Sequence, residues 1–457
     1  MTSRQAHPEK GGLARASEKG ISYYETAGIV ERVGLKDVEC LSQRSLLTHN
    51  SKKLILVMVG MPARGKSFIA AKLYSFLSWS GYKTRVFNVG AHRRSRGGEE
   101  NKRSAHSEAS FFDSSNLEAK ARREALAMEV LDSLLAWLLE EEGDIGIFDA
   151  TNSTRARRRA VVERCGEHPS TSVVFVESLC DDLAILDANM RTKVTSSPDF
   201  RGMDFESALV DLRKRIANYE KSYEPVQDVE GAYVKMHDFS SKITANLCFG
   251  RMSKTVVPFC AAIHSDDRPV FVTALAPRQH EPEFVAAADV DVDFGPRLAE
   301  WWWRRRPDSR LSVYSSTMPL AIDAAKTIQS TAPDLVTLTH TSALNPLLVC
   351  ADPNVTSAPK RRDLHDRGPD SGESYADLVS RLETVLLDIE ASVDSVLIVT
   401  HATPARALRA YFKNIRVIDC MGPSTSPETK ALADAVPAVL ELGPKVGGGW
   451  LETIHVL

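Results

Sequence analysis

Short apolar runs alternate with longer stretches of helical spacing along most of the chain, beginning near Lys52. Residues Leu54–Val59 form a continuous apolar run, which is typical of a strand buried on both faces of a parallel sheet. A glycine-containing loop follows, and a helical pattern then extends from Lys66 to Trp79. This order of strand, loop and helix predicts an α/β domain.

The same alternation continues through the first half of the chain. One long helix is predicted over residues 117–141, and further strands are predicted at Thr84–Val89, Ile145–Asp149, Ser172–Glu177 and Ala232–Met236. Strands that alternate with helices in this way indicate a parallel α/β sheet.

A second α/β pattern begins near Arg268. Its predicted strands are Pro269–Thr273, Leu311–Tyr314 and Ser395–Thr400, with helical stretches between them. A chain of 457 residues is too long for one ordinary hydrophobic core, so two domains are expected. The predicted organisation is a disordered polar tail over residues 1–51, one α/β domain over residues 52–264 and a second over residues 265–457.

Composition serves mainly to exclude certain binding partners and certain kinds of site. The formal net charge of −3 argues against bulk electrostatic attraction to nucleic acid or to a membrane. The 7 cysteines are scattered without CxxC or Cys/His ligand spacing, which argues against a disulfide framework or a zinc site. The first residues lack the apolar core of a signal peptide, and no apolar run is long enough to span a bilayer. We therefore expect a cytoplasmic protein.

The loop after the first strand carries the most specific chemical signal. It fits the phosphate-binding pattern GxxxxGK[ST] and lies between a buried strand and a helix. Glycines let several backbone N–H groups face one anion, and the helix N-terminus adds partial positive charge. The alternative, an ordinary connection between a strand and a helix, is disfavoured by this context. The residues expected to contact a nucleotide are Gly60, Met61, Pro62, Ala63, Arg64, Gly65, Lys66 and Ser67.

Two of these residues, together with the end of a later strand, have predicted chemical roles. Lys66 would reach the β- and γ-phosphates, and Ser67 would hold Mg²⁺ through its hydroxyl. Asp149 ends a predicted parallel strand, and ligands of open α/β sheets bind at that edge. Asp149 could orient Mg²⁺ or accept the proton of an attacking hydroxyl. The competing interpretation is a solvated Asp that caps the next helix with Thr151 and Asn152.

Arginines supply candidates for binding a phosphorylated acceptor, because a guanidinium group can fork to two phosphate oxygens. For most of them a solvated helix face is the simpler interpretation, and the residue pattern does not say which acceptor binds. The candidates are Arg93, Arg94, Arg122, Arg123, Arg155, Arg157, Arg158 and Arg215.

Taken in order, these motifs resemble the 6-phosphofructo-2-kinase/fructose-2,6-bisphosphatase family. The resemblance extends from about Lys53 to the C-terminus, and it is specific in the first half and patchy in the second. It implies a P-loop kinase domain with a parallel sheet, followed by a histidine-phosphatase-like α/β domain. The runs that carry it are Val57–Ser67, Phe87–Gly90 with Arg93 and Arg94, Phe148–Arg155, Val176–Cys180, Ser197–Phe200, and Arg215 and Ile216 with Tyr219 and Glu220.

The resemblance implies an enzyme that uses ATP and Mg²⁺ to phosphorylate the 2-hydroxyl of fructose 6-phosphate, and it suggests a homodimer. It implies nucleotide contacts at Phe68 and Asn189. The catalytic residues that it implies are Lys66, Asp149, Cys180 and Lys193. The implied contacts to the sugar phosphate are Arg93, Arg123, Thr151, Arg157, Arg215 and Tyr219.

One departure from the family pattern affects the kinase half. The family places a lysine three residues before its Ser-Pro-Asp, where this chain has Val194, and Lys193 stands one residue early. In a loop, a local shift could still bring the ammonium group to the site. In a regular helix, the shift rotates the side chain by about 100°. We expect a local deviation that keeps Lys193 in the active site.

The second half departs further. Ala274 and Leu275 stand where the family has Arg-His, and Leu275 has no lone pair to attack phosphorus. Pro319 and Leu320 replace a basic pair, and the loop at Ser342–Val349 has no acidic proton donor. His401 and the run Gly372–Tyr375 are retained. The resemblance therefore implies a degenerate phosphatase domain without hydrolytic activity.

Three functions remain open from the sequence. The first is a 6-phosphofructo-2-kinase without bisphosphatase activity. The second is a catalytically weak or inactive regulator that binds nucleotide or sugar phosphate, which the shift at Lys193 and the degenerate second domain favour. The third is a different phosphotransferase that shares only the phosphate loop, and the ordered series of motifs argues against it.

Overall fold

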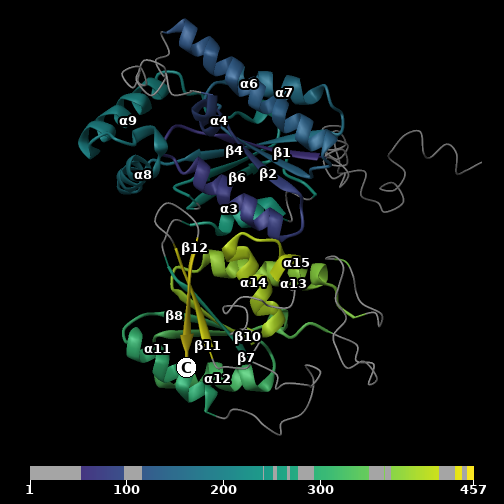
Figure 1. Ribbon diagram of the computed structural model, residues 1–457, viewed down its shortest axis with the longest axis vertical. Coiled ribbons are helices and arrows are strands. Elements are labelled where there is room, and N and C mark those ends of the chain that lie inside the picture. Colours follow the sequence, from purple (N-terminus) through teal and green to yellow (C-terminus); the bar gives the residue numbers. More distant parts are fainter. Residues whose placement is uncertain are drawn as a thin grey trace, which may run out of the picture.

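The chain forms two α/β units, each built on a six-stranded sheet, that follow one another along the longest axis of the molecule (Figure 1). The predicted tail over residues 1–51 lies outside the described residues. The computed structural model describes residues 53–96, 116–239, 241–250, 255–264, 268–275, 293–348, 365, 372–420, 438–444 and 450–457.

The first sheet has the strand order β2-β3-β1-β4-β5-β6. Neighbouring strands from β2 to β5 are parallel, and β6 pairs antiparallel with β5. All five predicted strands of this half are confirmed, whereas β6 was not predicted because its short sequence lacks a buried apolar run. The strands are β1 Lys53–Val59, β2 Thr84–Asn88, β3 Ile145–Asp149, β4 Thr171–Leu179, β5 Tyr233–His237 and β6 Lys242–Asn246.

Strand β1 lies at the centre of this sheet, and its alternating side chains enter two different cores. Leu54, Leu56 and Met58 pack on the side of α3, which spans Lys66–Trp79 as predicted. Ile55 and Val57 pack on the opposite side with α6, Leu117–Glu140. The remaining helices of this unit are α4 Val89–Arg96, α7 Arg155–Gly166, α8 Leu183–Ser196, α9 Phe205–Glu220 and α10 Val257–Ala262, with short 3₁₀ helices η4 Pro198–Phe200 and η5 Asp228–Glu230.

The second sheet has the strand order β12-β11-β7-β10-β8-β9. Strands β7, β10, β8 and β9 are parallel, and β11 and β12 add an antiparallel edge. The sequence pattern predicted β7, β8 and β10 but not β9, β11 or β12. The strands are β7 Val270–Leu275, β8 Leu311–Ser315, β9 Val336–His340, β10 Ser395–His401, β11 Ala438–Pro444 and β12 Trp450–Val456. The helices are α11 Phe294–Arg305, α12 Pro319–Thr331, α13 Tyr375–Ala391, α14 Ala402–Lys413 and α15 Val417–Cys420, with 3₁₀ helix η7 Ser342–Leu344.

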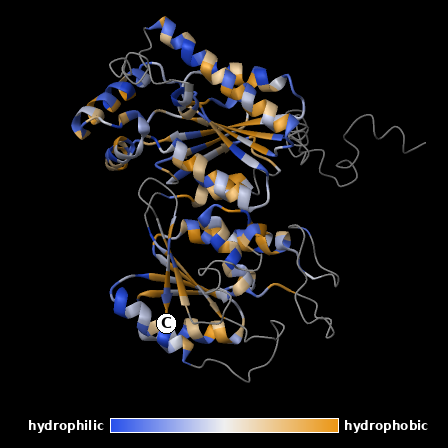
Figure 2. Ribbon diagram, in the orientation of Figure 1, coloured by the Kyte–Doolittle hydropathy of each residue, from blue (hydrophilic) through white to orange (hydrophobic). Residues whose placement is uncertain are grey.

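Apolar side chains are concentrated in the strands of both sheets, while the outer helices mix polar and apolar residues (Figure 2). Helix α3 of the first unit lies against α13 and α14 of the second (Figure 1), and one hydrophobic cluster runs through this contact without a break. Within the described part of the chain, no helix has both the length and the apolar composition needed to cross a bilayer.

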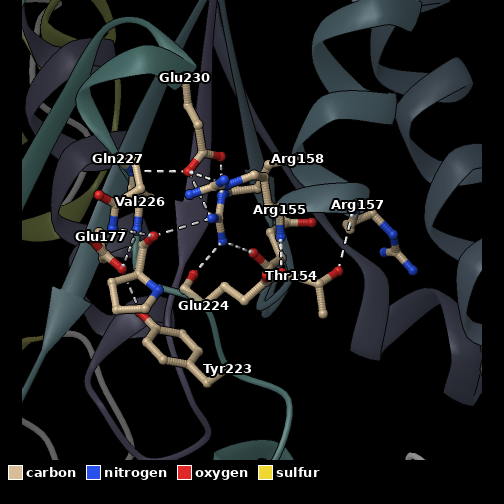
Figure 3. A network of polar contacts seen from close by, with 12 residues as sticks. Thr154, Arg155, Arg157, Arg158, Glu177, Tyr223, Glu224, Val226, Gln227 and Glu230 are labelled. Atoms are coloured by element: carbon tan, nitrogen blue, oxygen red, sulfur yellow. Dashed lines mark hydrogen bonds and ion pairs between the residues drawn. The ribbon is translucent and has the colours of Figure 1, made fainter.

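A buried network of charged residues joins α7 to the segment before β5 (Figure 3). Arg158 is 0% exposed, and its guanidinium group donates two hydrogen bonds to Glu230 at 2.7 and 2.9 Å. It also donates to the carbonyl oxygens of Asn152 and Glu224 at 3.1 and 2.8 Å. Because Asn152 has a positive φ of 42°, this contact helps to fix the turn that follows Asp149.

We expect Arg158→Met to lower the free energy of unfolding by about 3–5 kcal/mol, because it leaves Glu230 and two carbonyl oxygens without their buried partner. Urea unfolding followed by circular dichroism measures this change. Arg159→Met is the matched control, since Arg159 lies next to it on α7 with an exposed side chain paired only with Glu163. Equal stability of the two variants would contradict the structural role of Arg158.

Candidate active site

The phosphate loop between β1 and α3 has a backbone conformation that depends on glycine. Gly60 has φ 139° and Gly65 has φ 84°, both in a region that favours glycine. A Cβ atom on Gly60 would lie 2.6 Å from the carbonyl oxygen of Ser178, on β4. A Cβ atom on Gly65 would lie 2.9 Å from the ring of Phe239. The loop is therefore tightly fitted to its neighbours, as a preformed anion cradle requires.

Lys66 begins α3 and is buried in the loop. Its Nζ donates a hydrogen bond to the carbonyl oxygen of Met61 at 2.5 Å. Burial lowers the pKa of Lys66 to about 7, with Lys193 and Arg64 acting in the same direction and Asp149 opposing them. A buried ammonium among other cations is poised to gain from a nearby phosphate, whose negative charge stabilises the protonated form.

Asp149 lies at the carboxyl end of β3, as predicted. It is 4% exposed, and its Oδ2 accepts a hydrogen bond of 2.5 Å from the side-chain amide of Asn88, its register partner at the end of β2. The competing interpretation, a solvated Asp that caps the next helix, is wrong. Asp149 is buried, and the N-cap of α7 is Thr154.

Ser67 and Asp149 were predicted to hold a metal ion. Among the described residues, no group of three or more His, Cys, Asp or Glu side chains could hold a metal ion unaided. Mg²⁺ in phosphoryl-transfer sites is usually held by one or two protein oxygens and completes its shell with phosphate oxygens and water. The exposed side chain of Ser67, in the first turn of α3, and the Asp149 carboxylate fit such a partial set.

Three arginines converge on a single carboxylate, that of Asp199 in η4. Asp199 accepts from Arg93 at 2.8 Å, from Arg94 at 3.2 Å and from Arg215 at 3.4 Å. Burial acts to raise the pKa of Asp199. The guanidinium groups of Arg93, Arg94 and Arg215 outweigh this effect, so the pKa lies below its ordinary value. The cluster places two of the predicted sugar-phosphate contacts, Arg93 and Arg215, around one anionic group.

Lys193 reaches the site from a regular helix, so the expected local deviation of the backbone is wrong. Helix α8 continues unbroken from Leu183 to Ser196. The one-residue shift turns Val194 inward, where it is 7% exposed and packs with Phe200 and Leu212. The shift leaves Lys193 facing charged groups. Burial lowers its pKa, while Asp149 and Asp199 act to raise it.

Other predicted residues have more varied surroundings. Arg157 forms an ion pair with Glu124 of α6 and donates to the carbonyl oxygen of Arg123 at 3.1 Å, so these two predicted arginines lie together. The carbonyl oxygen of Thr151 accepts a hydrogen bond of 3.0 Å from the backbone N–H of Gly60, which links the Asp149 turn to the phosphate loop. Tyr219 lies half-buried in the last turn of α9.

Three further predicted residues lie on or beside α8 and α3. The amide nitrogen of Asn189 is buried and has no hydrogen-bond partner among the described residues, which is compatible with a contact to a ligand. Phe68 is partly exposed on α3 and packs edge-on against Phe239. Burial raises the pKa of Cys180 to about 11, helped by a hydrogen bond to Asp238. Cys180 therefore keeps its proton at neutral pH and is a poor nucleophile.

Sequence reasoning assigned no role to Asn88 or to Asp199. Asn88 orients the Asp149 carboxylate, and Asp199 holds the arginine cluster. Both residues lie within the runs that carry the family resemblance, and this was the only signal that pointed to them. Asn88 and Asp149 are 61 positions apart in the chain, and Arg93 and Asp199 are 106 positions apart. Their roles therefore depend on contacts that form only in the folded protein.

A second cluster of polar residues lies at the carboxyl edge of the second sheet. His401 ends β10 and is the register partner of Leu275 at the end of β7. Its Nε2 lies 2.9 Å from the hydroxyl oxygen of Ser316. Burial, and then the charge of Arg381, lower the pKa of His401 to about 4, so the ring is neutral at physiological pH. Arg381 is bound by the carboxylate of Glu373.

Comparison with known proteins identifies both units. Residues 42–267 match the family described as 6-phosphofructo-2-kinase, and residues 348–420 match the histidine phosphatase superfamily (branch 1). The chain is 34% identical over 390 residues to the 6-phosphofructo-2-kinase/fructose-2,6-bisphosphatase of Arabidopsis thaliana, a match that covers 81% of this chain and 51% of that protein. It is 33% identical over 408 residues to 6-phosphofructo-2-kinase 1 of Saccharomyces cerevisiae, covering 80% of this chain and 48% of that protein.

The chain thus spans about half the length of these plant and yeast relatives. A relative of more similar length is the 6-phosphofructo-2-kinase/fructose-2,6-bisphosphatase of Caenorhabditis elegans, which is 34% identical over 384 residues. That match covers 78% of this chain and 81% of the nematode protein. The two α/β units, the phosphate loop and these matches together show that the chain belongs to the 6-phosphofructo-2-kinase/fructose-2,6-bisphosphatase family.

Proposed function

We propose that this protein is a 6-phosphofructo-2-kinase, which transfers the γ-phosphoryl group of ATP to the 2-hydroxyl of fructose 6-phosphate. The products are fructose 2,6-bisphosphate and ADP. The observation that carries this proposal is the meeting of a phosphate loop, the Asp149 carboxylate and an arginine cluster at one edge of the first sheet. The printed names of the relatives support the same reaction.

On the nucleotide side, the backbone of the phosphate loop and the ammonium group of Lys66 bind the phosphates of ATP. Lys66 leaves the carbonyl oxygen of Met61 and stabilises the charge that moves toward the β-phosphate during transfer. Ser67 and Asp149 would hold Mg²⁺, which neutralises phosphate charge when it is bound. Asn189 offers its buried amide nitrogen to the nucleotide.

On the acceptor side, the arginine cluster binds the 6-phosphate of the sugar. A phosphate dianion carries more negative charge than the Asp199 carboxylate. It therefore competes with that carboxylate for the guanidinium groups of Arg93 and Arg215. The Asp149 carboxylate accepts the proton of the attacking 2-hydroxyl or orients the metal ion. Lys193 lies between the two sides, near both Asp149 and Asp199, and stabilises the transferring phosphoryl group.

A regulator that binds ligands without turning them over is the second candidate. The replacement of the family lysine by Val194 favoured this reading, because it removes a cation at the expected position. The placement of Lys193 near Asp149 and Asp199 weakens that argument, since the neighbouring residue supplies a cation from the same helix. The assay below distinguishes the two candidates.

We propose in addition that the second domain does not hydrolyse fructose 2,6-bisphosphate. Leu275 stands where the family has its nucleophilic histidine, and a hydrocarbon side chain cannot attack phosphorus. His401 is neutral at physiological pH, and its Nε2 lies 2.9 Å from the hydroxyl oxygen of Ser316. Arg381, the nearby cation, is bound by Glu373 and by carbonyl oxygens.

Incubation of the full chain with ATP, Mg²⁺ and fructose 6-phosphate is expected to give fructose 2,6-bisphosphate. Lys66→Met should lower turnover by about 100-fold or more, because it removes a cation that stabilises charge in the transition state. Product is measured by chromatography, and Lys83→Met, at an exposed position just before β2, serves as the control. A folded wild-type chain that binds ATP but forms no product would favour the regulator instead.

The role of Lys193 is tested by two neighbouring substitutions. We expect Lys193→Met to lower turnover by about 100-fold, through loss of a cation near the transferring group. Val194→Lys should reduce stability without raising turnover, because it introduces a charge into an apolar cluster. Lys214→Met, at an exposed position on α9, is the control. Unchanged turnover in Lys193→Met, together with faster turnover in Val194→Lys, would reverse this assignment.

Fructose 2,6-bisphosphate labelled at the 2-phosphate is expected to release no phosphate above the uncatalysed rate and to leave no acid-labile label on the protein. Leu275→His alone should not restore release, because Ala274 and Leu320 still provide no cation for the phosphoryl oxygens. Release by the wild-type chain that disappears in His401→Ala would show that the second domain retains a working nucleophile.

A further inference from the structure

Helix α3 is shared by the two domains. It starts at Lys66 in the phosphate loop, and its inner face, with Ile69 and Leu73 fully buried, packs on β1. Its outer face is turned toward α13 and α14 of the second domain (Figure 1). The helix that presents the nucleotide-binding lysine is thus held from both sides.

An ion pair lies at the centre of this contact. The Nζ of Lys72, on α3, lies 2.9 and 3.0 Å from the two carboxylate oxygens of Glu390, on α13. Tyr411, on α14, donates a hydrogen bond of 2.7 Å to the same carboxylate. The side chains of Lys72 and Glu390 are 17% and 6% exposed, so the pair is largely screened from water. Burial, and then the charge of Glu390, raise the pKa of Tyr411 well above its ordinary value.

Aromatic contacts fix the last turn of α3. The indole N–H of Trp79 donates a hydrogen bond of 2.7 Å to the carbonyl oxygen of Ala407, on α14. The ring of Trp79 meets the ring of Tyr411 edge-on at 6.1 Å. Phe76, one turn earlier, stacks on Phe259 of α10 at 4.0 Å. These contacts fix the position of α3 along its axis and its rotation about that axis, relative to the second domain.

The contact is connected to the phosphate loop through packed side chains. Gly65 of the loop lies against the ring of Phe239, and Phe239 meets Phe68 edge-on at 5.7 Å. The ammonium group of Lys72 lies 5.9 Å from the centre of the Phe68 ring and 5.2 Å from that of Trp450, on β12. A rotation of α3 at Lys72 therefore cannot leave the loop at Gly65 undisturbed.

We propose that the second domain serves nucleotide binding as a docking platform for α3, with Glu390 as the positioning residue. Apolar packing alone tolerates small changes in register, whereas an ion pair with two short contacts and a tyrosine donor accepts one arrangement. A role as a docking platform explains why the domain keeps its core although Ala274 and Leu275 stand where the family has Arg-His. This inference goes beyond the proposed kinase activity and rests only on the nucleotide site.

The test measures the affinity of the full chain for MgATP by calorimetry, so it does not depend on turnover. Glu390→Gln and Lys72→Met each leave one buried group without its charged partner, and each should weaken MgATP binding by about fivefold or more. The double variant Lys72→Met/Glu390→Gln removes both charges together and should recover most of the affinity. Lys83→Met is the control, because its partner Glu142 lies in an exposed pair at 3.8 Å.

Two results would overturn the platform. One is an unchanged dissociation constant in folded single variants whose melting temperature has fallen. The other is a double variant whose loss of MgATP binding free energy equals the sum of the losses in the two single variants. If Glu390→Gln does not fold, Trp79→Phe decides, since it keeps an aromatic ring but deletes the hydrogen bond to Ala407 and should weaken MgATP binding about twofold or more. Intact binding without product formation would refute the proposed reaction and leave the platform standing.

Discussion

The burial of α3 on both sides is the constraint on which the rest of the structure depends. Strand β1 supplies the apolar floor beneath the helix, and α13 and α14 of the second domain cover it. A helix held in this way cannot shift without opening a core, so the loop at its N-terminus has a fixed place. That loop in turn is packed against β4 at Gly60, where a Cβ atom would lie 2.6 Å from the carbonyl oxygen of Ser178.

Positive charge at the site exceeds what the local carboxylates balance. Lys66, Lys193 and the three arginines of the cluster outnumber the carboxylates of Asp149, Asp199 and Asp211, the last of which is paired with Arg215. Burial lowers the pKa of both lysines. Cations held close together without matching anions are costly in a low-dielectric setting. A phosphate group close to these cations lowers this cost, because its negative charge balances theirs.

The fold of the second domain does not rest on the polar residues at the carboxyl edge of its sheet. Its parallel strands and their core depend on apolar side chains that face inward, and none of these takes part in catalysis. Leu275 ends β7 as the register partner of His401 and packs against this core. What the domain retains is a surface, formed by Glu390, Ala407 and Tyr411, that α3 needs in order to be covered.

The sequence by itself determined the local elements of the kinase half. The apolar run of β1, the glycine pattern of the loop and the bounds of α3 are all encoded by neighbouring residues, so periodicity and motif spacing were enough to predict them. The antiparallel edges β6, β11 and β12 were missed, because pairing at a sheet edge depends on strands that are distant in the chain. The same holds for the contact of Asn88 with Asp149.

Only the tertiary structure decided where Val194 and Lys193 lie. A lysine displaced by one residue was expected to need a local deviation of the backbone to reach the site. Helix α8 is regular instead, and Val194 lies in an apolar cluster. Periodicity predicts which residues share a face, but it does not say which element that face meets. The direction of Lys193, the convergence of three arginines on Asp199 and the ion pair between Lys72 and Glu390 all depend on that second piece of information.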